Sequence, residues 1–188
     1  MVGAPFLSIG EAAQSLRDGQ VVAYPTEAVY GLGCDPSSES AVRRVLELKS
    51  RPEAAGLILI ADRFERFDPF IGPLRPGLLD RAMATWPGPV TWLFPRGDRV
   101  PDWLAGTHST VAVRVTAHPV SRDLCAAFGG ALVSTSANPR SSEPARTAER
   151  VVEYFGDALA GIVEGSLGHE LRPSEIRDLA TGRTIRES

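Results

Sequence analysis

The segment at residues 20–33, QVVAYPTEAVYGLG, decides the fold of this chain. Its first four residues, QVVA, form a short apolar run bounded by polar residues, which is typical of a buried strand. The run leads into a polar turn, Pro-Thr-Glu, at residues 25–27. The Gly-Leu-Gly stretch at residues 31–33 lets the backbone approach a neighbouring group closely, because glycine has no Cβ. Open α/β sheets commonly bind ligands beyond strand ends of this kind.

Helix and strand patterns alternate on both sides of this segment, within a length of 188 residues that suits one domain. Ser8 and Glu11 form a capping-box pattern before a helix that Gly19 ends. Further helices are expected at 38–50, 78–86, 120–128 and 147–155, and further strands at 57–60, 90–94, 111–115, 132–138 and 162–163. This alternation predicts an α/β fold with a mixed sheet.

The charge balance excludes a protein that binds nucleic acid with its whole surface. The formal net charge is −3 and the isoelectric point is about 5.7, whereas such proteins are usually basic. No apolar run approaches the roughly 20 residues that span a bilayer. The N-terminus lacks the basic and apolar regions of a signal peptide. We therefore expect a cytoplasmic protein without a membrane contact.

The residue types that bind metals most often do not cluster in this sequence. Cys34 and Cys125 lie far apart without a CxxC pair, which favours two buried, reduced thiols over a zinc or redox site. His108, His118 and His169 are scattered, and we expect them to be structural or exposed. Walker A, Rossmann and HExxH patterns are absent. We predict no metal site built by the protein alone.

Lys49 is the one lysine among 20 basic residues, the others being arginine. It opens the triplet Lys-Ser-Arg at residues 49–51, where the second helix ends. Two interpretations are open. Cations at a helix C-terminus stabilise the helix dipole by roughly 0.3–1 kcal/mol. Alternatively, a phosphate site requires the compact, rotatable ammonium of lysine, which a planar guanidinium does not replace.

Two further segments carry candidate binding side chains. STSAN at residues 134–138 follows an apolar strand. It forms either ordinary hydroxyl and Asx turns or a cluster of donors for a phosphate or carboxylate. Arg114 lies in the apolar strand AVRV. It is either an ion-paired or edge residue, or it binds a substrate carboxylate.

Taken together and in this order, the segments resemble the YrdC-like family. The resemblance rests on PTEAVYGLG, a helix that ends in LKSRP, and then GLILI, WPGPVT, AVRVTAHP, STSAN and PSEIRD. It covers about residues 19–186. The family's signature, KxR followed by SxN, falls on Lys49, Arg51, Ser136 and Asn138. One departure is visible, because Ala55 stands where the family often has a basic residue that contacts phosphate.

The resemblance implies a single YrdC-like domain over residues 1–188, with its core at about 8–186. Its fold would be a twisted mixed sheet with flanking helices around a deep, positively lined cavity. The implied activity is that of a nucleotidyltransferase, which converts L-threonine, bicarbonate and ATP into threonylcarbamoyl-AMP and pyrophosphate. A downstream tRNA threonylcarbamoyl-transferase complex would then modify position 37 of tRNAs that read ANN codons. Direct contact with tRNA is expected to be weak.

For this reaction, we assign roles to particular residues as a hypothesis. Lys49 and Arg51 are the expected catalytic residues, and they bind ATP together with Ser136 and Asn138. Mg²⁺ is expected to arrive on the ATP phosphates, because no acidic cage is evident. The expected threonine-binding residues are Thr26, Tyr30, Arg114 and Thr135.

Two alternatives remain at this point. The first is an RNA-binding or ribosome-assembly factor without catalysis, which the acidic isoelectric point, the 7% aromatic content and the lack of an RNP pattern count against. The second is a carbamoyl-transfer domain such as that of hydrogenase maturation. That larger protein carries cysteine-rich zinc modules, and this chain has two cysteines.

Overall fold

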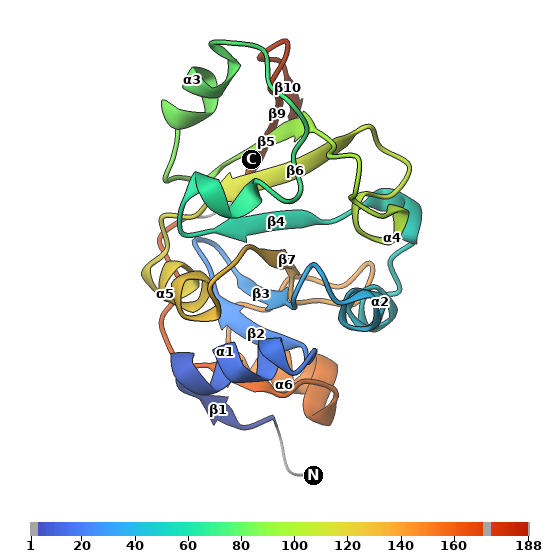
Figure 1. The fold of residues 1–188 in the computed structure, drawn as a ribbon. Coiled ribbons are helices and arrows are strands. Elements are labelled where there is room, and N and C mark those ends of the chain that lie inside the picture. The colour runs from blue at the N-terminus through green and yellow to red at the C-terminus, as the bar shows by residue number, and fades with distance from the viewer. Residues whose placement is uncertain (1–3, 171–173, 188) are drawn as a thin grey trace.

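A mixed β-sheet of ten strands runs through the computed structural model, which describes residues 4–170 and 174–187 (Figure 1). From one edge to the other, the strands are β1 (Phe6–Leu7), β8 (Gly161–Val163), β2 (Val22–Pro25), β3 (Tyr30–Gly33), β7 (Leu132–Ser136), β4 (Ile58–Ala61), β6 (Thr110–Val115), β5 (Val90–Pro95), β9 (Glu175–Asp178) and β10 (Thr184–Arg186). Parallel pairs such as β4–β6 alternate with antiparallel pairs such as β2–β3. The predicted mixed sheet is confirmed.

Helices cover both faces of this sheet. They are α1 (Ile9–Arg17), α2 (Glu39–Leu48), α3 (Leu78–Met83), α4 (Asp102–Ala105), α5 (Pro119–Phe128) and α6 (Ala148–Phe155), with short 3₁₀ turns η1 (Glu53–Ala55), η2 (Phe64–Phe67) and η3 (Gly156–Ala158). The five predicted helices are present, although the one expected at residues 78–86 ends at Met83. None of the helices in the described residues is long and apolar enough to cross a membrane.

Side chains at the helix starts explain where α1 and α2 begin. Glu11 Oε2 accepts a hydrogen bond from the backbone N–H of Ser8 at 2.8 Å, and Ser8 Oγ accepts one from Glu11 in return at 3.3 Å. This is the predicted capping box. Ser38 Oγ accepts from Ala41 N at 3.3 Å and begins α2. These bonds satisfy backbone donors that have no partner inside the helix.

The pleat of the strands divides the apolar residues into two cores. Alternate residues of a strand point to opposite faces, and here both faces are buried. Tyr24, Ile60 and Leu132 pack on the face that carries α1 and α5. Ala23 and Leu59 pack on the other face, with α2 and α6. A sheet covered on both sides requires apolar runs rather than alternating patterns, which is why runs such as LILI predicted strands.

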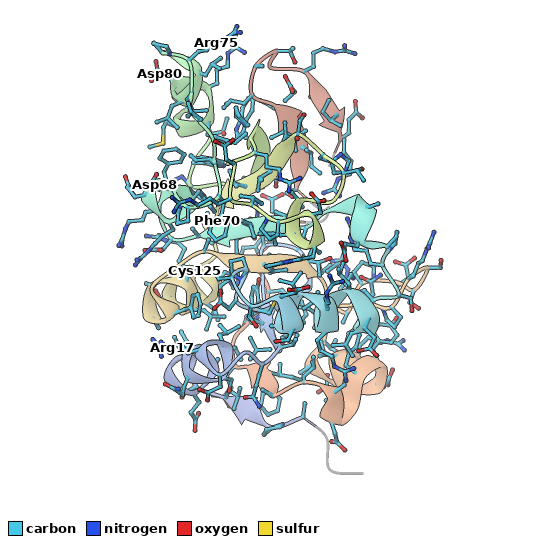
Figure 2. The ribbon with its side chains drawn as sticks, turned by 45° about the vertical axis from the view of Figure 1, so that its right-hand side comes forward. Arg17, Asp68, Phe70, Arg75, Asp80 and Cys125 are labelled. Atoms are coloured by element: carbon cyan, nitrogen blue, oxygen red, sulfur yellow. The ribbon has the colours of Figure 1, made fainter. Side chains whose placement is uncertain are left out.

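Helices α1 and α5 lie side by side on one face of the sheet (Figure 1). Arg17, at the end of α1, donates a hydrogen bond to the Ala127 carbonyl of α5, and Figure 2 shows Arg17 and Cys125 on these two helices. Cys125 is fully buried against the sheet, and Cys34 is buried as well; both thiols are free. Burial raises the pKa of each thiol. The prediction of two buried, reduced cysteines is confirmed.

The glycines of β3 make room for an aromatic ring from β2. Tyr24 pairs with Gly31 across the strands, and its side chain is completely buried. A Cβ on Gly33 would lie 2.6 Å from the Tyr24 ring and 3.0 Å from the Val133 carbonyl oxygen. The ring therefore occupies the space that a side chain on Gly33 would need.

This packing predicts opposite effects of alanine at two glycines. Gly33→Ala should lower the free energy of unfolding by about 1–3 kcal/mol, because the new methyl group overlaps a ring held inside the core. Gly10→Ala, on the open surface of α1 with no atom within 4 Å of its added Cβ, should be neutral or stabilising by up to about 1 kcal/mol. Urea denaturation of both variants measures this, and equal midpoints would contradict it.

Candidate functional site

A cavity of about 220 Å³ lies against the sheet, where the turn after β2 faces the middle strands. Ser134 pairs with Ile58 and Arg114 pairs with Ile60, so these side chains share one face of the sheet. Ile60 packs under α5 on that face. Helices α1 and α5 thus cover one part of this face of the sheet, and the cavity occupies another part.

Lys49, Ser136 and Asn138 form one hydrogen-bonded cluster beside the cavity. Lys49 is the C-cap residue of α2, and its Nζ donates to the backbone oxygens of Ser136 at 2.5 Å and Asn138 at 2.8 Å. Asn138 Oδ1 lies 3.3 Å from the same ammonium and accepts from Ser136 Oγ at 2.6 Å. Asn138 Nδ2 donates to Ser142 O at 2.7 Å. The structure therefore brings together three of the four signature residues through direct bonds.

The surroundings of Lys49 favour loss of its proton more than is usual for lysine. The side chain is 6% exposed. Burial, together with the nearby positive charge of Arg51, lowers the pKa of Lys49 to about 8. Because three oxygens already surround the ammonium, its first effect in this structure is to hold residues 136–138 in place.

Arg51 and Arg186 form a cationic end of the cavity. The Arg51 guanidinium donates to the carbonyl of Gly56 at 2.9 Å and to that of Ala55 at 3.2 Å. Arg186 donates to Ser174 O at 2.7 Å. Burial lowers the pKa of both arginines, and the charge of Arg51 lowers the pKa of Arg186 further. Two cations that repel each other beside a cavity favour an anion between them.

Glu27 and Arg114 form a buried ion pair elsewhere on the cavity wall. Arg114 Nη1 lies 2.5 Å from Glu27 Oε1, and the two side chains are 8% and 13% exposed. Thr116 Oγ1 donates to the same oxygen at 2.6 Å, and the backbone N–H of Ala117 does so at 3.3 Å. Although burial opposes ionisation, the charge of Arg114 and these hydrogen bonds lower the pKa of Glu27. The carboxylate therefore stays charged at neutral pH.

The other expected threonine-binding residues also line the cavity, in different ways. Thr26 Oγ1 donates to Val29 O at 2.7 Å, which leaves its lone pairs free to accept. The Tyr30 hydroxyl lies 3.5 Å from Gly165 O, and burial raises its pKa. Thr135 pairs with Leu32, so its side chain points to the face opposite Ser134 and Ser136. Thr135 therefore offers its backbone to the cavity.

Sequence reasoning gave no role to Glu27 and Arg186, which line this cavity, or to Thr116, which donates to Glu27. Glu27 stands inside the quoted PTE turn, and Arg186 is the last residue of the segment that resembles the YrdC-like family. Thr116 follows Arg114 by two residues, on the same face. The contact between Glu27 and Arg114 joins residues 87 positions apart, so no local pattern indicated it. Among the described residues, three arginines and two glutamates line the cavity. Arg114 neutralises Glu27, so two arginines and one glutamate remain and the cavity wall is positive on balance.

The histidines behave as expected. His118 is buried and caps α5, where its Nδ1 accepts from Ser121 N at 3.4 Å. His108 and His169 are exposed. Within residues 4–170 and 174–187, no group of three His, Cys, Asp or Glu side chains is placed to hold a metal ion.

Comparisons with known proteins point to one family along nearly the whole chain. The Sua5/YciO/YrdC family model, described as "Telomere recombination", matches residues 14–188. A protein of Pseudomonas savastanoi pv. phaseolicola named threonylcarbamoyl-AMP synthase is 52% identical over 178 residues, which cover 95% of this chain and 96% of the relative.

Solved structures agree with this match. The structure of P. abyssi Sua5 complexed with L-threonine superposes with a TM-score of 0.87 at 30% identity; the match covers 98% of this chain and 56% of that one. This chain therefore spans about half the length of that protein. E. coli YciO shares the fold with a TM-score of 0.85 at 23% identity, and the match covers 100% of this chain and 96% of that one.

The burial of Lys49 predicts an early titration that can be observed directly, since this is the chain's one lysine. In protein labelled with ¹³C at the lysine Cε, the single side-chain resonance should titrate with a pKa of about 8. In 8 M urea the same resonance should return to about 10.4, the value of an exposed lysine. A folded-state midpoint equal to that in urea would contradict the prediction.

The same shift predicts how stability changes with pH. Between pH 8 and 10.5, the unfolded chain still holds the proton that folded Lys49 has released. Stability should therefore rise through this window relative to Lys49→Met, which has no such group. Urea denaturation of both proteins at pH 7 and pH 10 measures the difference, and parallel changes in the two proteins would count against it.

Proposed function

This chain belongs to the Sua5/YciO/YrdC family, and on that premise we propose that it is a threonylcarbamoyl-AMP synthase. The enzyme is a nucleotidyltransferase that converts L-threonine, bicarbonate and ATP into threonylcarbamoyl-AMP and pyrophosphate. One structural observation supports the proposal. A single cavity has a cationic end at Arg51 and Arg186 and an ion pair suited to an amino acid at Glu27 and Arg114.

The reaction has two bond-forming steps. The threonine ammonium first loses a proton, and the neutral amine then attacks bicarbonate, which gives a carbamate and water. A carbamate oxygen then attacks the α-phosphate of ATP, and the bond to the leaving pyrophosphate breaks. Such phosphoryl chemistry depends mainly on positioning and on neutralisation of charge, which are the properties that this cavity supplies.

The phosphates bind at the cationic end. The planar guanidinium groups of Arg51 and Arg186 offer paired donors to phosphate oxygens. Ser136 and Asn138 provide hydrogen bonds to the nucleotide, and Lys49 holds these two residues in position. Lys49 also adds a positive charge behind them, beside the phosphates. The repulsion between Arg51 and Arg186 is relieved when an anion binds.

The amino acid binds at the other polar group of the cavity. Arg114 receives its carboxylate, and Thr26 Oγ1, whose own hydrogen is donated to Val29 O, accepts a hydrogen bond from an N–H or O–H of the amino acid. Tyr30 and the backbone of Thr135 complete the wall. This division places the threonine amine between its carboxylate site and the phosphate site, where bicarbonate has to enter.

Magnesium enters as part of the Mg·ATP substrate. The described residues offer no cluster of acidic side chains for it, and Mg²⁺ in phosphate-transferring enzymes commonly keeps several waters and binds mostly through substrate phosphates. The metal supplies charge neutralisation of the polyphosphate. The task of this chain is then to orient the phosphates with Arg51 and Arg186.

The product serves tRNA modification in the cytoplasm. A downstream transferase complex takes the threonylcarbamoyl group to position 37 of tRNAs that read ANN codons. With a net charge of −3, the enzyme contacts tRNA weakly at most. Neither an RNA-binding factor without catalysis nor a hydrogenase-maturation domain is favoured, because a synthase relative matches over 95% of this chain.

Omission of each substrate in turn tests this function. Pyrophosphate release by the purified protein should require L-threonine, bicarbonate and Mg·ATP together, because the nucleophile exists only after the first two have combined. A coupled pyrophosphate assay measures it, with bicarbonate removed by degassing. Equal turnover without threonine would remove the synthase assignment.

Lys49→Arg tests the role of the single lysine. A guanidinium is too wide for the space between the Ser136 and Asn138 oxygens, which lie 2.5 Å and 2.8 Å from Nζ. Residues 136–138 should shift, and kcat/KM should fall at least ~10-fold, about 1.4 kcal/mol of transition-state stabilisation. Lys49→Ala should lose more.

The exposed Arg44 provides the matched control for this change. It lies on the same helix and, among the described residues, pairs with Glu47 at the surface, so Arg44→Ala should keep the activity of the wild type. If Lys49→Arg also retains wild-type kinetics, the lysine merely complements the end of α2.

A further inference from the structure

The ion pair between Glu27 and Arg114 leaves one nitrogen of Arg114 without a partner and one oxygen of Glu27 that bonds no other described residue. Arg114 Nε is buried and has no hydrogen-bond partner in the described residues. In the same part of the chain, no residue other than Glu27 itself donates to Glu27 Oε2, whereas Oε1 accepts three hydrogen bonds. A buried N–H without a partner costs about 1–3 kcal/mol. Both side chains line the cavity, so a ligand that enters the cavity meets this ion pair.

The carboxylate is held rigidly, so that the position of Oε2 is fixed. Thr116 is completely buried and donates to Oε1. Its own hydroxyl accepts from the backbone N–H of His118 at 3.2 Å, and His118 Nε2 lies 3.0 Å from Ser166 O. A chain of bonds thus connects Glu27 to the start of α5. Groups that are fixed before binding lose little entropy when the ligand arrives.

A contribution to the stability of the fold is a weak explanation for a buried ion pair of this kind. Removing two charges from water costs several kcal/mol per ion, and well-packed apolar residues often replace a buried pair without loss. The carboxylate of Glu27 and the guanidinium of Arg114, both on the cavity wall, match the two charges of an amino acid. The ammonium fits a carboxylate oxygen, and the carboxylate fits an arginine N–H.

We propose that Glu27 binds the protonated amino group of the substrate through Oε2 while Arg114 binds its carboxylate. The pair then acts as a receptor for the zwitterion of an α-amino acid, and Glu27 determines specificity for the amino group. This inference rests on the proposed function and extends it, because it names the group that distinguishes an amino acid from the corresponding hydroxy acid.

Wild-type protein gives the first test. Isothermal titration calorimetry should be performed with L-threonine and with (2S,3R)-2,3-dihydroxybutanoate, which replaces the ammonium by a hydroxyl and keeps the rest. Threonine should bind at least ~10-fold more tightly, because the analogue leaves the Glu27 carboxylate without a charged partner. Equal affinities within twofold would overturn the inference without any variant.

Glu27→Gln gives the second test, because it removes the charge and keeps the shape. The ratio of the two dissociation constants should fall from at least ~10 to about 1–2, since an amide does not prefer an ammonium over a hydroxyl. Thr116→Val is the matched control: it loosens the carboxylate but keeps its charge. Thr116→Val should weaken both ligands alike and preserve the ratio. Circular dichroism checks that each variant is folded.

The outcomes separate this inference from the synthase proposal. If Glu27→Gln weakens threonine and the analogue by the same factor, Glu27 only positions Arg114 and the inference fails. Pyrophosphate release by the wild type would still support the synthase proposal in that case. If Glu27→Gln does not fold, the wild-type ratio decides alone. Absence of threonine binding in the wild type overturns both proposals.

Discussion

Burial of Arg114 in the middle of the sheet is the constraint on which the site depends. A guanidinium in this position requires an anion, because an unpaired buried charge is strongly destabilising. The anion comes from Glu27, which follows β2, although β3, β7 and β4 separate β2 from β6. The turn after β2 therefore has to fold back over these three strands. The cavity lies on the wall that this turn and the strands share, so one ion pair fixes both the turn and the wall of the proposed substrate site.

A second constraint acts at the end of α2. This helix ends at Leu48, and Lys49 turns its side chain inward to bond residues 136 and 138. A small ammonium satisfies several oxygens at once without a preferred plane, whereas a guanidinium imposes one. That difference explains why one lysine persists in a chain whose other basic residues are all arginine. The helix-dipole interpretation alone requires no bond to Ser136 or Asn138, whereas the structure has both bonds.

The sequence predicted those parts of the fold that depend on local patterns. Capping residues and apolar periodicity located the helices, and apolar runs located strands such as β4 and β6. Strands β1, β3, β9 and β10 were not predicted. For two of them the physical reason is clear: YGLG in β3 is glycine-rich because the Tyr24 ring occupies its side-chain space, and β10 is exposed along its whole length. The partners Glu27 and Arg186 were missed because their roles depend on contacts between residues far apart in the chain. The family signature found Lys49, Ser136 and Asn138, whereas the direction of the Thr135 side chain follows only from strand register.

The charges of the cavity also suggest how the proposed reaction moves forward. L-threonine arrives as a zwitterion, and its ammonium balances Glu27. Formation of the carbamate replaces this positive group by a negative one beside the same carboxylate. Like charges at short distance in a partly buried site repel strongly, so the carbamate moves away from Glu27. The cationic end at Arg51 and Arg186 attracts it, and the proposed site of the α-phosphate lies there. The charge reversal that creates the nucleophile therefore also directs it toward its target, while the carboxylate stays bound to Arg114.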